Sequence, residues 1–485
     1  MCKTKIVATL GPASQDEGVL SRMLDAGVNV VRLNFSHGTA QEHIEKANLV
    51  RKLARQKGKT VGVLADLQGP KIRISTFSGS KVHLVQGQTF FLDASLGAKQ
   101  GDAERVGLDY PDLIQDLETG NILLLDDGRI QLKVQELDPN RSWVKTEVLN
   151  SGVLSDRKGI NLLGGGLSAP ALTDKDIVDI DIAAAIQADF VAISFPRNGA
   201  DIDYARSLIR KAGSQADVIA KIERAETVAS NESMDNIIAA SDAIMVARGD
   251  LGVEIGDGRL PTIQKRLIKR ARLAGKPVIT ATQMMESMIE NPLPTRAEVL
   301  DVANAILDGS DAVMLSAESA AGKYPIESIE AMVRIAAGVE FDSGSSQEHW
   351  DELDSLCDNP NKSFAISSII SATKANRKLG VAILTGDGQT PRLMSRCQSD
   401  AQVWGLSSNE KVLGKMTLLR GVMPTHFNVA QQDDLLESVT QMLSDHTTQF
   451  DLESLLIVKL SSLEGQGEVN TCWMVNLGET DAIPA

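Results

Sequence analysis

Three apolar segments in the middle of the chain each lead into charged or hydroxyl side chains. The polar pairs that follow these segments are Lys221 with Glu223, Arg248 with Asp250, and Thr280 with Thr282. Side chains two residues apart in a β-strand share a face, so we expect the members of each pair to point the same way. Cations, two carboxylates and hydroxyls on rigid strand ends suit metal-assisted handling of an anionic substrate.

Glu223 and Asp250 are the natural metal pair, because a hard divalent ion such as Mg²⁺ takes one or two carboxylates together with substrate oxygens and waters. Lys221 is then expected beside the ion. Each acid alone is explained better as a salt-bridge partner, but three polar strand ends in series reverse that preference and favour the metal site. The backbone amides of Gly249 and Asp250 could bind a carboxylate, because glycine lets a ligand approach closely. Thr282 could position a water or relay a proton, although a buried hydroxyl bonded to backbone is the plainer explanation.

Further polar groups are expected at the same mouth. Arg32, Asn34 and Ser36 alternate with apolar residues at the end of a predicted strand, and Arg32 would hold phosphate in a bidentate fork. Lys71 and Arg73 follow the next strand and share a face, although two exposed cations at a domain junction explain them equally well.

Eight short aliphatic runs are predicted to be the strands that carry these side chains. They span residues 5–10, 29–36, 61–66, 190–195, 218–223, 243–250, 277–283 and 312–319. Amphipathic helical spacing is found between them at residues 40–56, 174–186, 200–212, 261–274 and 295–307. Eight strand-helix units favour a closed (β/α)8 TIM barrel over an open sheet, and so an α/β fold class.

The segment between the third and fourth predicted strands is too long to be a single crossover connection, so it is expected to hold an inserted domain. Residues 71–166 read as short alternating strands with turn signals, a small β-barrel lid over the mouth. Gly164, Gly165 and Gly166 could form its hinge, and a plain turn is an equal alternative.

The barrel domain is therefore predicted at residues 1–70 and 167–342, followed by a polar linker at residues 343–362. Residues 363–485 alternate helices with strands at residues 381–385, 402–406 and 455–460, which predicts a C-terminal open α/β domain.

The composition narrows the possible partners and compartments. The chain has 485 residues and a net charge of −15, which argues against a nucleic-acid or anionic-membrane surface. Its four cysteines are scattered without a zinc or Cys-x-x-Cys spacing, and we expect reduced thiols. The N-terminus enters an apolar strand directly, and no apolar run is long enough to span a membrane. A cytoplasmic location is expected.

With these residues in hand, the chain resembles the pyruvate kinase family through all three predicted domains. The most specific stretches are residues 32–38, 220–223, 245–254 and 280–288. The resemblance implies transfer of the phosphoryl group of phosphoenolpyruvate to ADP, giving pyruvate and ATP in glycolysis through an enolate intermediate. It also implies a divalent cofactor, Mg²⁺ or Mn²⁺, an allosteric enzyme, and a homotetramer.

Carried over residue by residue, the resemblance implies that Glu223 and Asp250 bind the metal and that Lys221 stabilises charge on the phosphoryl group and enolate. Arg32 and Arg73 would grip phosphate, and Thr282 would take part in proton delivery. Supporting positions in the matching motifs are Lys71, Arg248, Gln283, Glu286, Ser316 and Glu318.

The chain departs from the family at its potassium site. Relatives often have an acid where this chain has Lys71, and they bind potassium through neighbouring oxygen ligands. The corresponding positions here are Asn34, Ser36, Asp66 and Leu67. The Lys71 ammonium could supply the charge that the ion otherwise brings, so we predict that potassium is not required.

A second departure concerns a loop that cradles phosphate in relatives activated by sugar phosphates. Its residues here are Thr385, Gly386, Asp387, Gly388, Gln389 and Thr390. Asp387 stands where a hydroxyl is usual, and its carboxylate would repel phosphate while accepting from the same amides. A phosphorylated-metabolite or nucleotide effector remains possible. Arg392 and Arg396 could serve a different effector, but solvated helix charges explain them more simply.

Two rival functions fit parts of the pattern. An aldolase-type lyase also uses magnesium and a pyruvate enolate on a TIM barrel, but it needs neither a lid nor the phosphate grip of Arg32 and Arg73. A non-catalytic sensor that kept the fold would be expected to lose some of the predicted catalytic side chains. None of these is lost, as the chain retains Lys221, Glu223, Asp250 and Thr282.

Overall fold

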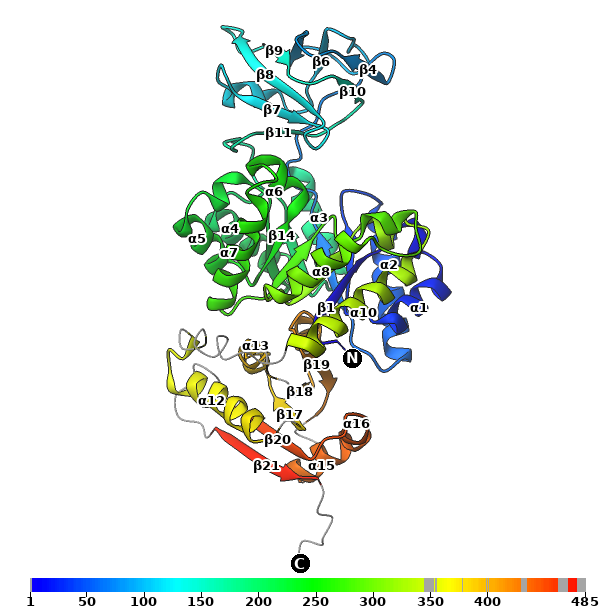
Figure 1. The fold of residues 1–485 in the computed structure, drawn as a ribbon, viewed down its shortest axis with the longest axis vertical. Coiled ribbons are helices and arrows are strands. Elements are labelled where there is room, and N and C mark those ends of the chain that lie inside the picture. Colours follow the sequence, from blue (N-terminus) through cyan, green and yellow to red (C-terminus); the bar gives the residue numbers. More distant parts are fainter. Residues whose placement is uncertain are drawn as a thin grey trace, which may run out of the picture.

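Three bodies are stacked along the long axis of the molecule (Figure 1). The computed structural model describes residues 2–343, 353, 356–376, 378–397, 399, 401–428, 434–460 and 470–477. Most of the linker expected at residues 343–362 lies outside the described residues, between a helix that ends at Ser343 and one that begins at Pro360. In the part of the chain that is described, no helix is long and apolar enough to cross a membrane.

The middle body is a closed barrel of eight parallel strands. In order around the barrel they are β1 (Lys5–Thr9), β16 (Ala312–Leu315), β15 (Val278–Ala281), β14 (Ala243–Ala247), β13 (Asp217–Ile222), β12 (Phe190–Ile193), β3 (Gly62–Asp66) and β2 (Val30–Asn34). The predicted TIM barrel is confirmed. Parallel strands covered on both faces must be apolar on both faces, which explains their aliphatic sequences.

Helices surround the barrel and bury their apolar stripes against its outer face. Their bounds are α1 (Glu17–Ala26), α2 (Ala40–Gln56), α3 (Asp174–Ala185), α4 (Gly199–Lys211), α5 (Asn231–Ala240), α6 (Arg248–Ile255), α7 (Leu260–Leu273), α8 (Arg296–Leu307), α9 (Ala317–Ala320) and α10 (Pro325–Ser343). Several of them start at a threonine whose hydroxyl accepts from the third helical amide, while the acid at that third position accepts from the threonine amide. Such a capping box satisfies two amides that the helix leaves free.

The barrel strands end earlier than the sequence predicts. The strand expected at residues 243–250 ends at Ala247, and α6 begins at Arg248. Arg248 and Asp250 therefore lie in the first turn of a helix, where residues two apart do not share a face. The strands expected to reach Gln283 and Ser319 likewise end at Ala281 and Leu315.

The inserted body, at the top of Figure 1, consists of two sheets around one core. The six-stranded sheet has the order β11 (Ile160–Leu162), β7 (Ile122–Leu125), β8 (Ile130–Leu137), β9 (Trp143–Val148), β5 (Thr89–Asp93) and β6 (Arg105–Gly107). β4 (Lys81–Leu84) and β10 (Gly152–Ser155) form the second sheet. The core of this body runs from Ile72 to Ala169 and is separate from that of the barrel.

The C-terminal body is a five-stranded sheet flanked by helices. The sheet order is β19 (Val422–His426), β18 (Gln402–Ser407), β17 (Leu379–Leu384), β20 (Ser454–Lys459) and β21 (Thr471–Asn476), with only β21 antiparallel among these strands. The helices are α12 (Pro360–Ala375), α13 (Gln389–Ser395), α14 (Glu410–Met416), α15 (Leu435–Met442) and α16 (Ser444–Gln449). The open α/β domain is confirmed, and β19 and β21 are strands that sequence reasoning missed.

Ion pairs join the C-terminal body to the amino ends of the barrel strands. Arg392 of α13 pairs with Asp217 at 2.6 Å, and Arg396 binds the buried Asp311 through two nitrogens. The expectation that both arginines are solvated helix charges is therefore wrong, because the acids that they neutralise lie on another domain. Leu418 of the same body packs into the barrel interior and closes this end.

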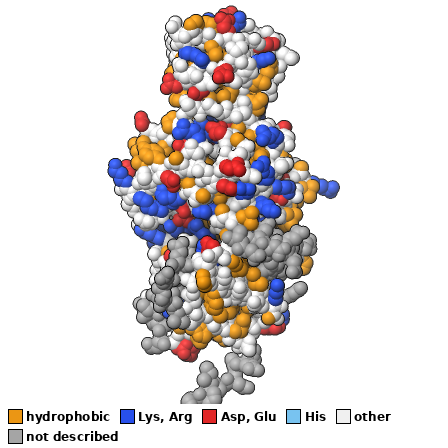
Figure 2. Space-filling model, turned by 90° about the vertical axis from the view of Figure 1, so that its left-hand side faces the viewer, with side chains coloured by type: hydrophobic (Ala, Val, Ile, Leu, Met, Phe, Trp, Pro, Cys, Tyr) orange, Lys and Arg blue, Asp and Glu red, His pale blue; other side chains and the backbone are white. Residues whose placement is uncertain are grey.

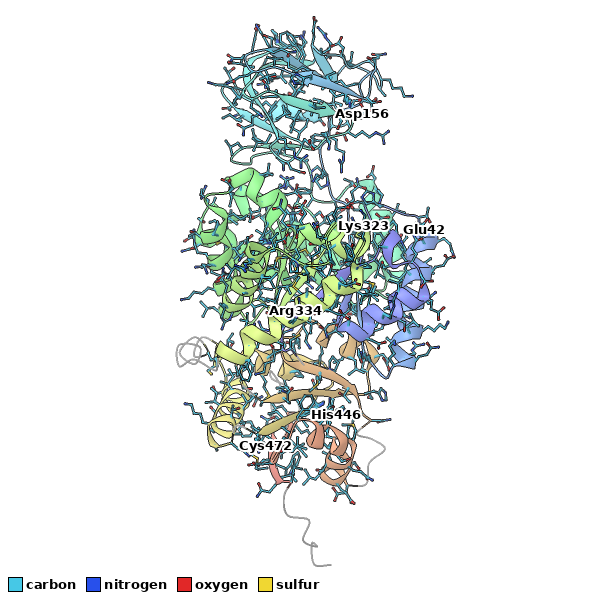
Figure 3. All side chains as sticks on the ribbon, turned by 45° about the vertical axis from the view of Figure 1, so that its right-hand side comes forward. Glu42, Asp156, Lys323, Arg334, His446 and Cys472 are labelled. Atoms are coloured by element: carbon cyan, nitrogen blue, oxygen red, sulfur yellow. The ribbon has the colours of Figure 1, made fainter. Side chains whose placement is uncertain are left out.

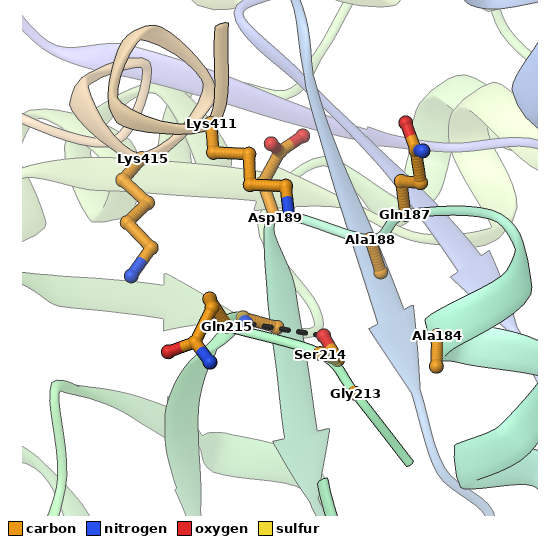
Figure 4. Close-up of a pocket in the computed structure, with 10 residues that line it drawn as sticks. Ala184, Gln187, Ala188, Asp189, Gly213, Ser214, Gln215, Lys411 and Lys415 are labelled. Atoms are coloured by element: carbon orange, nitrogen blue, oxygen red, sulfur yellow. Dashed lines mark hydrogen bonds between the residues drawn. The ribbon is translucent and has the colours of Figure 1, made fainter. Parts of the chain in front are cut away.

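A small pocket of about 140 Å³ lies at this junction, between α14 and the loops that precede β12 and β13 (Figure 4). Lys411 and Lys415 reach into it from α14. Lys415 pairs with Asp217 at 2.7 Å, and Asp189 accepts a 2.8 Å hydrogen bond from the amide of Val63. Burial raises the pKa of Asp189 to about 6. The charges of this pocket thus serve mainly to join the two domains.

The buried pair of Arg396 and Asp311 makes a testable contribution to stability. Asp311→Asn should lower the free energy of unfolding by about 3–5 kcal/mol, because it leaves the Arg396 charge buried without its counter-ion. The double variant Arg396→Met with Asp311→Asn should recover a large part of that loss. Thermal unfolding followed by calorimetry measures both, and equal stability of Asp311→Asn and the unmodified protein would contradict the role of the pair.

Candidate active site

The predicted site residues gather at the carboxyl ends of the barrel strands, on the side that faces the inserted body. In Figure 3, Glu42 and Lys323 lie at this end, while Arg334 lies toward the C-terminal body. Figure 2 shows the inserted body set above the barrel as a narrower lobe. Active sites of TIM barrels form at the carboxyl ends of the strands, where loops can vary without disturbing the core.

Lys221 lies at the centre of the site. It is on β13, and residues on either side of it pack outward against the helices, so its own side chain points into the barrel. Its ammonium donates to the hydroxyl of Ser194 at 2.7 Å and lies 3.0 Å from Glu223 and 3.3 Å from Asp66. Burial alone would lower the pKa of Lys221, but the two carboxylates outweigh it and raise the pKa above its ordinary value.

Glu223 follows the last residue of β13 and is almost fully buried. Its Oε2 accepts a 2.7 Å hydrogen bond from the amide of Phe195, whose φ of 53° turns that amide inward. Burial raises the pKa of Glu223 despite the neighbouring Lys221, and the charge of Asp250 raises it further. A second carboxylate is therefore close enough to be felt electrostatically.

Asp66 and Arg32 form the next part of the cluster, from the adjacent strands β3 and β2. Arg32 donates through Nε to Asp66 at 2.6 Å and through Nη1 to Thr9 at 3.0 Å. Burial would raise the pKa of Asp66, but Lys221 and Arg32 hold it below its ordinary value. Asp66 is thus an ionised counter-charge shared by two cations.

Asp250 lies in the first turn of α6, after the strand next to β13. Its Oδ1 is 3.0 Å from the ammonium of Lys71, which follows β3. No group of three or more metal-ligating acids, histidines or cysteines occurs among the residues that the structure describes. Two carboxylates, each bound to a lysine and each close enough to repel the other, fit a divalent cation that takes its remaining ligands from substrate and water.

Thr282 follows β15 in a strained backbone conformation. Thr282 and Gln283 have φ values of 67° and 54°, and a β-branched residue rarely adopts the left-handed region. Arg248 holds this turn by donating to the carbonyl oxygens of Thr282 at 2.8 Å and of Gln283 at 3.0 Å. The hydroxyl of Thr282 in turn accepts from the amide of Gly249 at 2.9 Å.

Two of the six side chains in the three predicted pairs, Thr280 and Arg248, do not reach the mouth of the barrel. Thr280 is fully buried, and its hydroxyl is 2.7 Å from that of Ser310. Because its neighbours Ile279 and Ala281 face the barrel interior, Thr280 points outward, and the expected convergence with Thr282 is wrong. Arg248 is also buried, behind Thr282, and its Nη1 pairs with Asp301 at 2.7 Å.

Arg73 lies on the inserted body and not beside Arg32. Its Nη1 donates to the carbonyl oxygen of Arg157 at 2.9 Å, and its amide donates to Asp109. Arg73 and Ile74 form isolated β-bridges with residues of the inserted body, and Ile72 and Ile74 belong to its core, so Arg73 is part of that body. The structure therefore does not bring this side chain to the predicted phosphate grip.

Three of the oxygens at the positions expected to bind potassium accept from protein donors. The side-chain oxygen of Asn34 accepts from the amide of Ser36 at 3.1 Å, and the carbonyl oxygen of Leu67 accepts from Ser194 at 2.7 Å. Asp66 is bound by Arg32 and lies near Lys221.

The remaining supporting residues surround the Thr282 turn. Glu318 is buried and accepts from the amide of Met285 at 3.2 Å and from that of Ser316 at 2.7 Å. It thereby ties the end of β16 to the segment after β15. Gln283 and Glu286 are exposed at the rim.

A cavity of about 460 Å³ opens beside Arg32. Sequence reasoning did not predict it. Its lining includes Thr9, Pro12, Arg32, Asn34, His37, Glu42, Lys46 and Ser316. Thr9 and Ser194, which bind Arg32 and Lys221, were also missed. Both are polar residues at the end of an aliphatic run, which is a signal that sequence reasoning could have used.

The loop at residues 385–390 is closed by its own side chains. The carboxylate of Asp387 accepts from the amide of Gln389 at 2.9 Å and from the hydroxyl of Thr385 at 3.2 Å. The amide of Gly388 donates to Thr385 at 2.9 Å. Asp387 thus takes an amide at the start of α13 that an anion would otherwise bind.

Two family models match the chain. "Pyruvate kinase, barrel domain" covers residues 1–329 and "Pyruvate kinase, alpha/beta domain" covers residues 365–475. Together they include the barrel, the inserted body and most of the C-terminal body.

Named relatives agree with these models. The chain is 53% identical over 425 residues to a pyruvate kinase of Haemophilus influenzae, covering 87% of this chain and 88% of the relative. It is 53% identical over 429 residues to pyruvate kinase II of Salmonella typhimurium, covering 88% of each. A crystal structure of a pyruvate kinase from Cryptosporidium parvum superposes with a TM-score of 0.89 at 32% identity, covering 98% of this chain and 96% of that one.

The charge cluster makes a prediction about stability and pH. Asp66→Asn should lower the free energy of unfolding at pH 7 by about 3–5 kcal/mol, because Arg32 and Lys221 then share a buried site without this counter-charge. The pKa of Asp66 is depressed in the folded state, so its contribution is present above the ordinary carboxylate pKa and is lost as pH falls through the folded value.

Thermal unfolding of the Asp66→Asn variant at pH 7 and at a pH below the ordinary carboxylate pKa of about 4 tests this prediction. The difference from the unmodified protein should be large at pH 7 and should shrink in acid. Asp25→Asn is a matched control, because Asp25 pairs with Lys57 on the exposed surface. Similar losses in the two variants would contradict the account.

Proposed function

The chain belongs to the pyruvate kinase family, and we propose that Lys221, Glu223, Asp250, Arg32 and Thr282 carry its reaction. The enzyme transfers the phosphoryl group of phosphoenolpyruvate to ADP, which gives pyruvate and ATP. The observation that carries the assignment of residues is the pair of carboxylates at the mouth, each bound to a lysine. Phosphoryl transfer asks a protein mainly for positioning and charge neutralisation, and this cluster supplies both.

Glu223 and Asp250 would hold the divalent cofactor, Mg²⁺ or Mn²⁺. When bound, such an ion neutralises charge on the phosphoryl oxygens and the enolate. The raised pKa of Glu223, caused by burial and by Asp250, supports the assignment, because a cation would relieve the repulsion between the two acids. When no ion is bound, the ammonium groups of Lys221 and Lys71 neutralise the negative charges of Glu223 and Asp250.

Several cationic side chains would each neutralise part of the negative charge of the substrate. Lys221 is held by Ser194 and two carboxylates, so its ammonium is fixed where negative charge develops on the bridging oxygen. Arg32 presents its guanidinium to the same space and has Asp66 to hold its orientation. Arg73 would join them only if the inserted domain, residues 71–166, closes over the mouth as a lid.

The amino end of α6 would bind the carboxylate of phosphoenolpyruvate, and the Thr282 turn would take part in protonating the enolate. The amides of Gly249 and Asp250 lie at the amino end of α6, where backbone N–H groups favour an anion, and a carboxylate would have to share the Gly249 amide with the Thr282 hydroxyl. The hydroxyl of Thr282 accepts from Gly249 and donates to the carbonyl oxygen of Ala281 at 2.6 Å. It would orient the proton donor for the enolate carbon.

ADP would occupy the 460 Å³ cavity beside Arg32. Lys46 and His37 line it and supply positive or donor groups for a diphosphate, and Arg32 lies where this cavity meets the charge cluster.

The contact between Lys71 and Asp250 supports activity without potassium. An ammonium 3.0 Å from the metal carboxylate supplies the charge that a monovalent ion would add. The side-chain oxygen of Asn34, the carbonyl oxygen of Leu67 and one carboxylate oxygen of Asp66 already accept from protein donors, which leaves fewer ligands for an ion.

We also propose a homotetramer, a cytoplasmic location and a limited role for the C-terminal loop. Exposed leucines on and beside α8 (Leu293, Leu300 and Leu307) and β21, the edge strand of its sheet among the described residues, offer surfaces for further copies. The four cysteines are free, which fits a reducing compartment.

An effector at residues 385–390 would have to displace or avoid Asp387, which favours a ligand other than a simple sugar phosphate.

Turnover tests the residue assignment. The purified protein should form pyruvate from phosphoenolpyruvate and ADP with Mg²⁺, and Lys221→Ala should lower kcat by about 10³-fold, because it removes a fixed charge at the reacting oxygen. Lys52→Ala is a matched control, since Lys52 forms an exposed pair with Glu17. Activity of a folded Lys221→Ala variant close to that of the control would refute the assignment.

Cation dependence tests the role of Lys71. The unmodified enzyme should keep its activity when potassium is replaced by tetramethylammonium. The activity of Lys71→Glu should be lower by about tenfold or more in tetramethylammonium and should recover in potassium. The variant has the acid that is often found in relatives but lacks the positive charge of the Lys71 ammonium, which potassium would replace. Lys71→Met should be impaired in both salts. A potassium requirement in the unmodified enzyme would eliminate the proposal.

A further inference from the structure

The chain leaves the lid through a short segment, residues 164–169, that we call the exit arm. Barrel residues bind its backbone along most of its length. The amide of Gly164 donates to the carbonyl oxygen of Glu254 at 2.9 Å. Arg224 donates to the carbonyl oxygens of Leu167 at 2.6 Å and Ala169 at 3.2 Å.

A second arginine completes the attachment. Arg197, from the loop after β12, donates to the carbonyl oxygen of Ser168 at 3.1 Å and is held by a two-nitrogen pair with Asp201. Three consecutive carbonyl oxygens of the arm therefore accept from two arginines. On the opposite side, the amide and hydroxyl of Ser168 both donate to Asp116 of the lid. The arm thus has fixed contacts to both bodies.

The first part of the arm is built for close contact with the barrel. Gly164, Gly165 and Gly166 have φ values of 91°, 79° and 103°. A Cβ atom at Gly165 would lie 2.2 Å from Oε2 of Glu226, whose other carboxylate oxygen, Oε1, accepts from Arg224 at 3.2 Å. Glycine adopts the left-handed backbone of this segment without strain.

The barrel elements that hold the arm are those that carry the metal carboxylates. Arg224 directly follows Glu223, so one peptide unit presents a carboxylate to the site and a guanidinium to the arm. Glu254 lies one turn after Asp250 on α6, and its side chain also accepts from the amide of Ala225 at 2.7 Å. Burial raises the pKa of Glu254 to about 7, as expected for an acid enclosed at this junction.

We infer that Arg224 and Arg197 are positioning residues that set the orientation of the lid relative to Glu223 and Asp250. This inference rests on the proposed catalytic site. Arg224 is 4% exposed, and its planar guanidinium binds two carbonyl oxygens at once, which fixes direction as well as distance. Because the amide of Gly164 and the carbonyl oxygens of residues 167–169 are all bound by barrel residues, the arm is fixed to the barrel at both of its ends.

Loss of this clamp has a chemical consequence. A lid that is wrongly oriented admits water to the site, and water can then replace ADP as the acceptor. In that reaction the bond between phosphorus and the enol oxygen breaks and a bond from phosphorus to the water oxygen forms. One hydrogen of the water stays on the phosphate, and a proton equivalent to the other is taken up by the enolate carbon. The products are pyruvate and inorganic phosphate, without ATP.

The experiment compares Arg224→Gln, Arg224→Lys and Arg197→Gln with a matched control. The control is Arg51→Gln, because Arg51 also donates to two consecutive carbonyl oxygens, those of Ile186 and Gln187, but on the far side of the barrel from the lid. Arg197 is more exposed than Arg224, so its variant guards against a folding defect in the other.

Hydrogen exchange of the free proteins provides the first readout. The amides of Gly164 and Ser168 should exchange faster in Arg224→Gln and Arg197→Gln than in Arg51→Gln, whatever the activity. Unchanged exchange of the arm in both lid variants would overturn the inference. This measurement stands even if the unmodified protein has no turnover, which would refute the proposed function alone.

The ratio of pyruvate to ATP provides the second readout. We expect a ratio of one for the unmodified enzyme and Arg51→Gln, and an excess of pyruvate with a kcat lower by about tenfold for Arg224→Gln. Arg224→Lys, which can bind one carbonyl oxygen, should fall between them. An Arg224→Gln variant with a ratio of one and the kcat of the control would show that the clamp does not position the lid.

Discussion

Burial of several charges in one place is the constraint on which this structure depends. At the mouth of the barrel, Asp66 lies between Arg32 and Lys221, and Lys221 also binds Glu223. None of these groups could be buried alone, because an unpaired charge in a protein interior costs several kcal/mol. Each is stable only while the neighbouring strand ends keep their register. The closed barrel provides that register, and the charges cannot move independently of it.

Charged side chains also hold the structure together at the other end of the barrel and at the lid. Aspartates at the amino ends of the strands are neutralised by arginines of the C-terminal domain, so Asp217 and Asp311 connect that domain to strands β13 and β16. β13 therefore has a domain contact at its start and Lys221, the lysine proposed to act in catalysis, near its end. Arg224, just beyond β13, adds the lid to this connection. One strand thus contacts the substrate site and lies next to the attachments of both other domains.

Much of this arrangement could be predicted from the sequence, because it depends on local patterns. Aliphatic runs with polar ends predicted the eight strands, and the alternation of residues predicted that Lys221 and Arg32 point inward. The errors arose where a strand ended earlier than its pattern. Thr280 faces outward because Ile279 and Ala281 fill the interior, and Arg248 lies on a helix behind Thr282. The pairing of Arg396 with Asp311 joins residues 85 apart and depends on how the domains pack, so no local pattern contains it.

The central claim is that Glu223 and Asp250 form one metal site whose charge is otherwise compensated by lysines. Titration of the protein with Mn²⁺, with free ion followed by electron paramagnetic resonance, tests it most directly. We predict a single ion per chain, bound about tenfold or more weakly in each of Glu223→Gln and Asp250→Asn. Mn²⁺ binding of unchanged affinity in either variant would place the metal elsewhere and contradict the account.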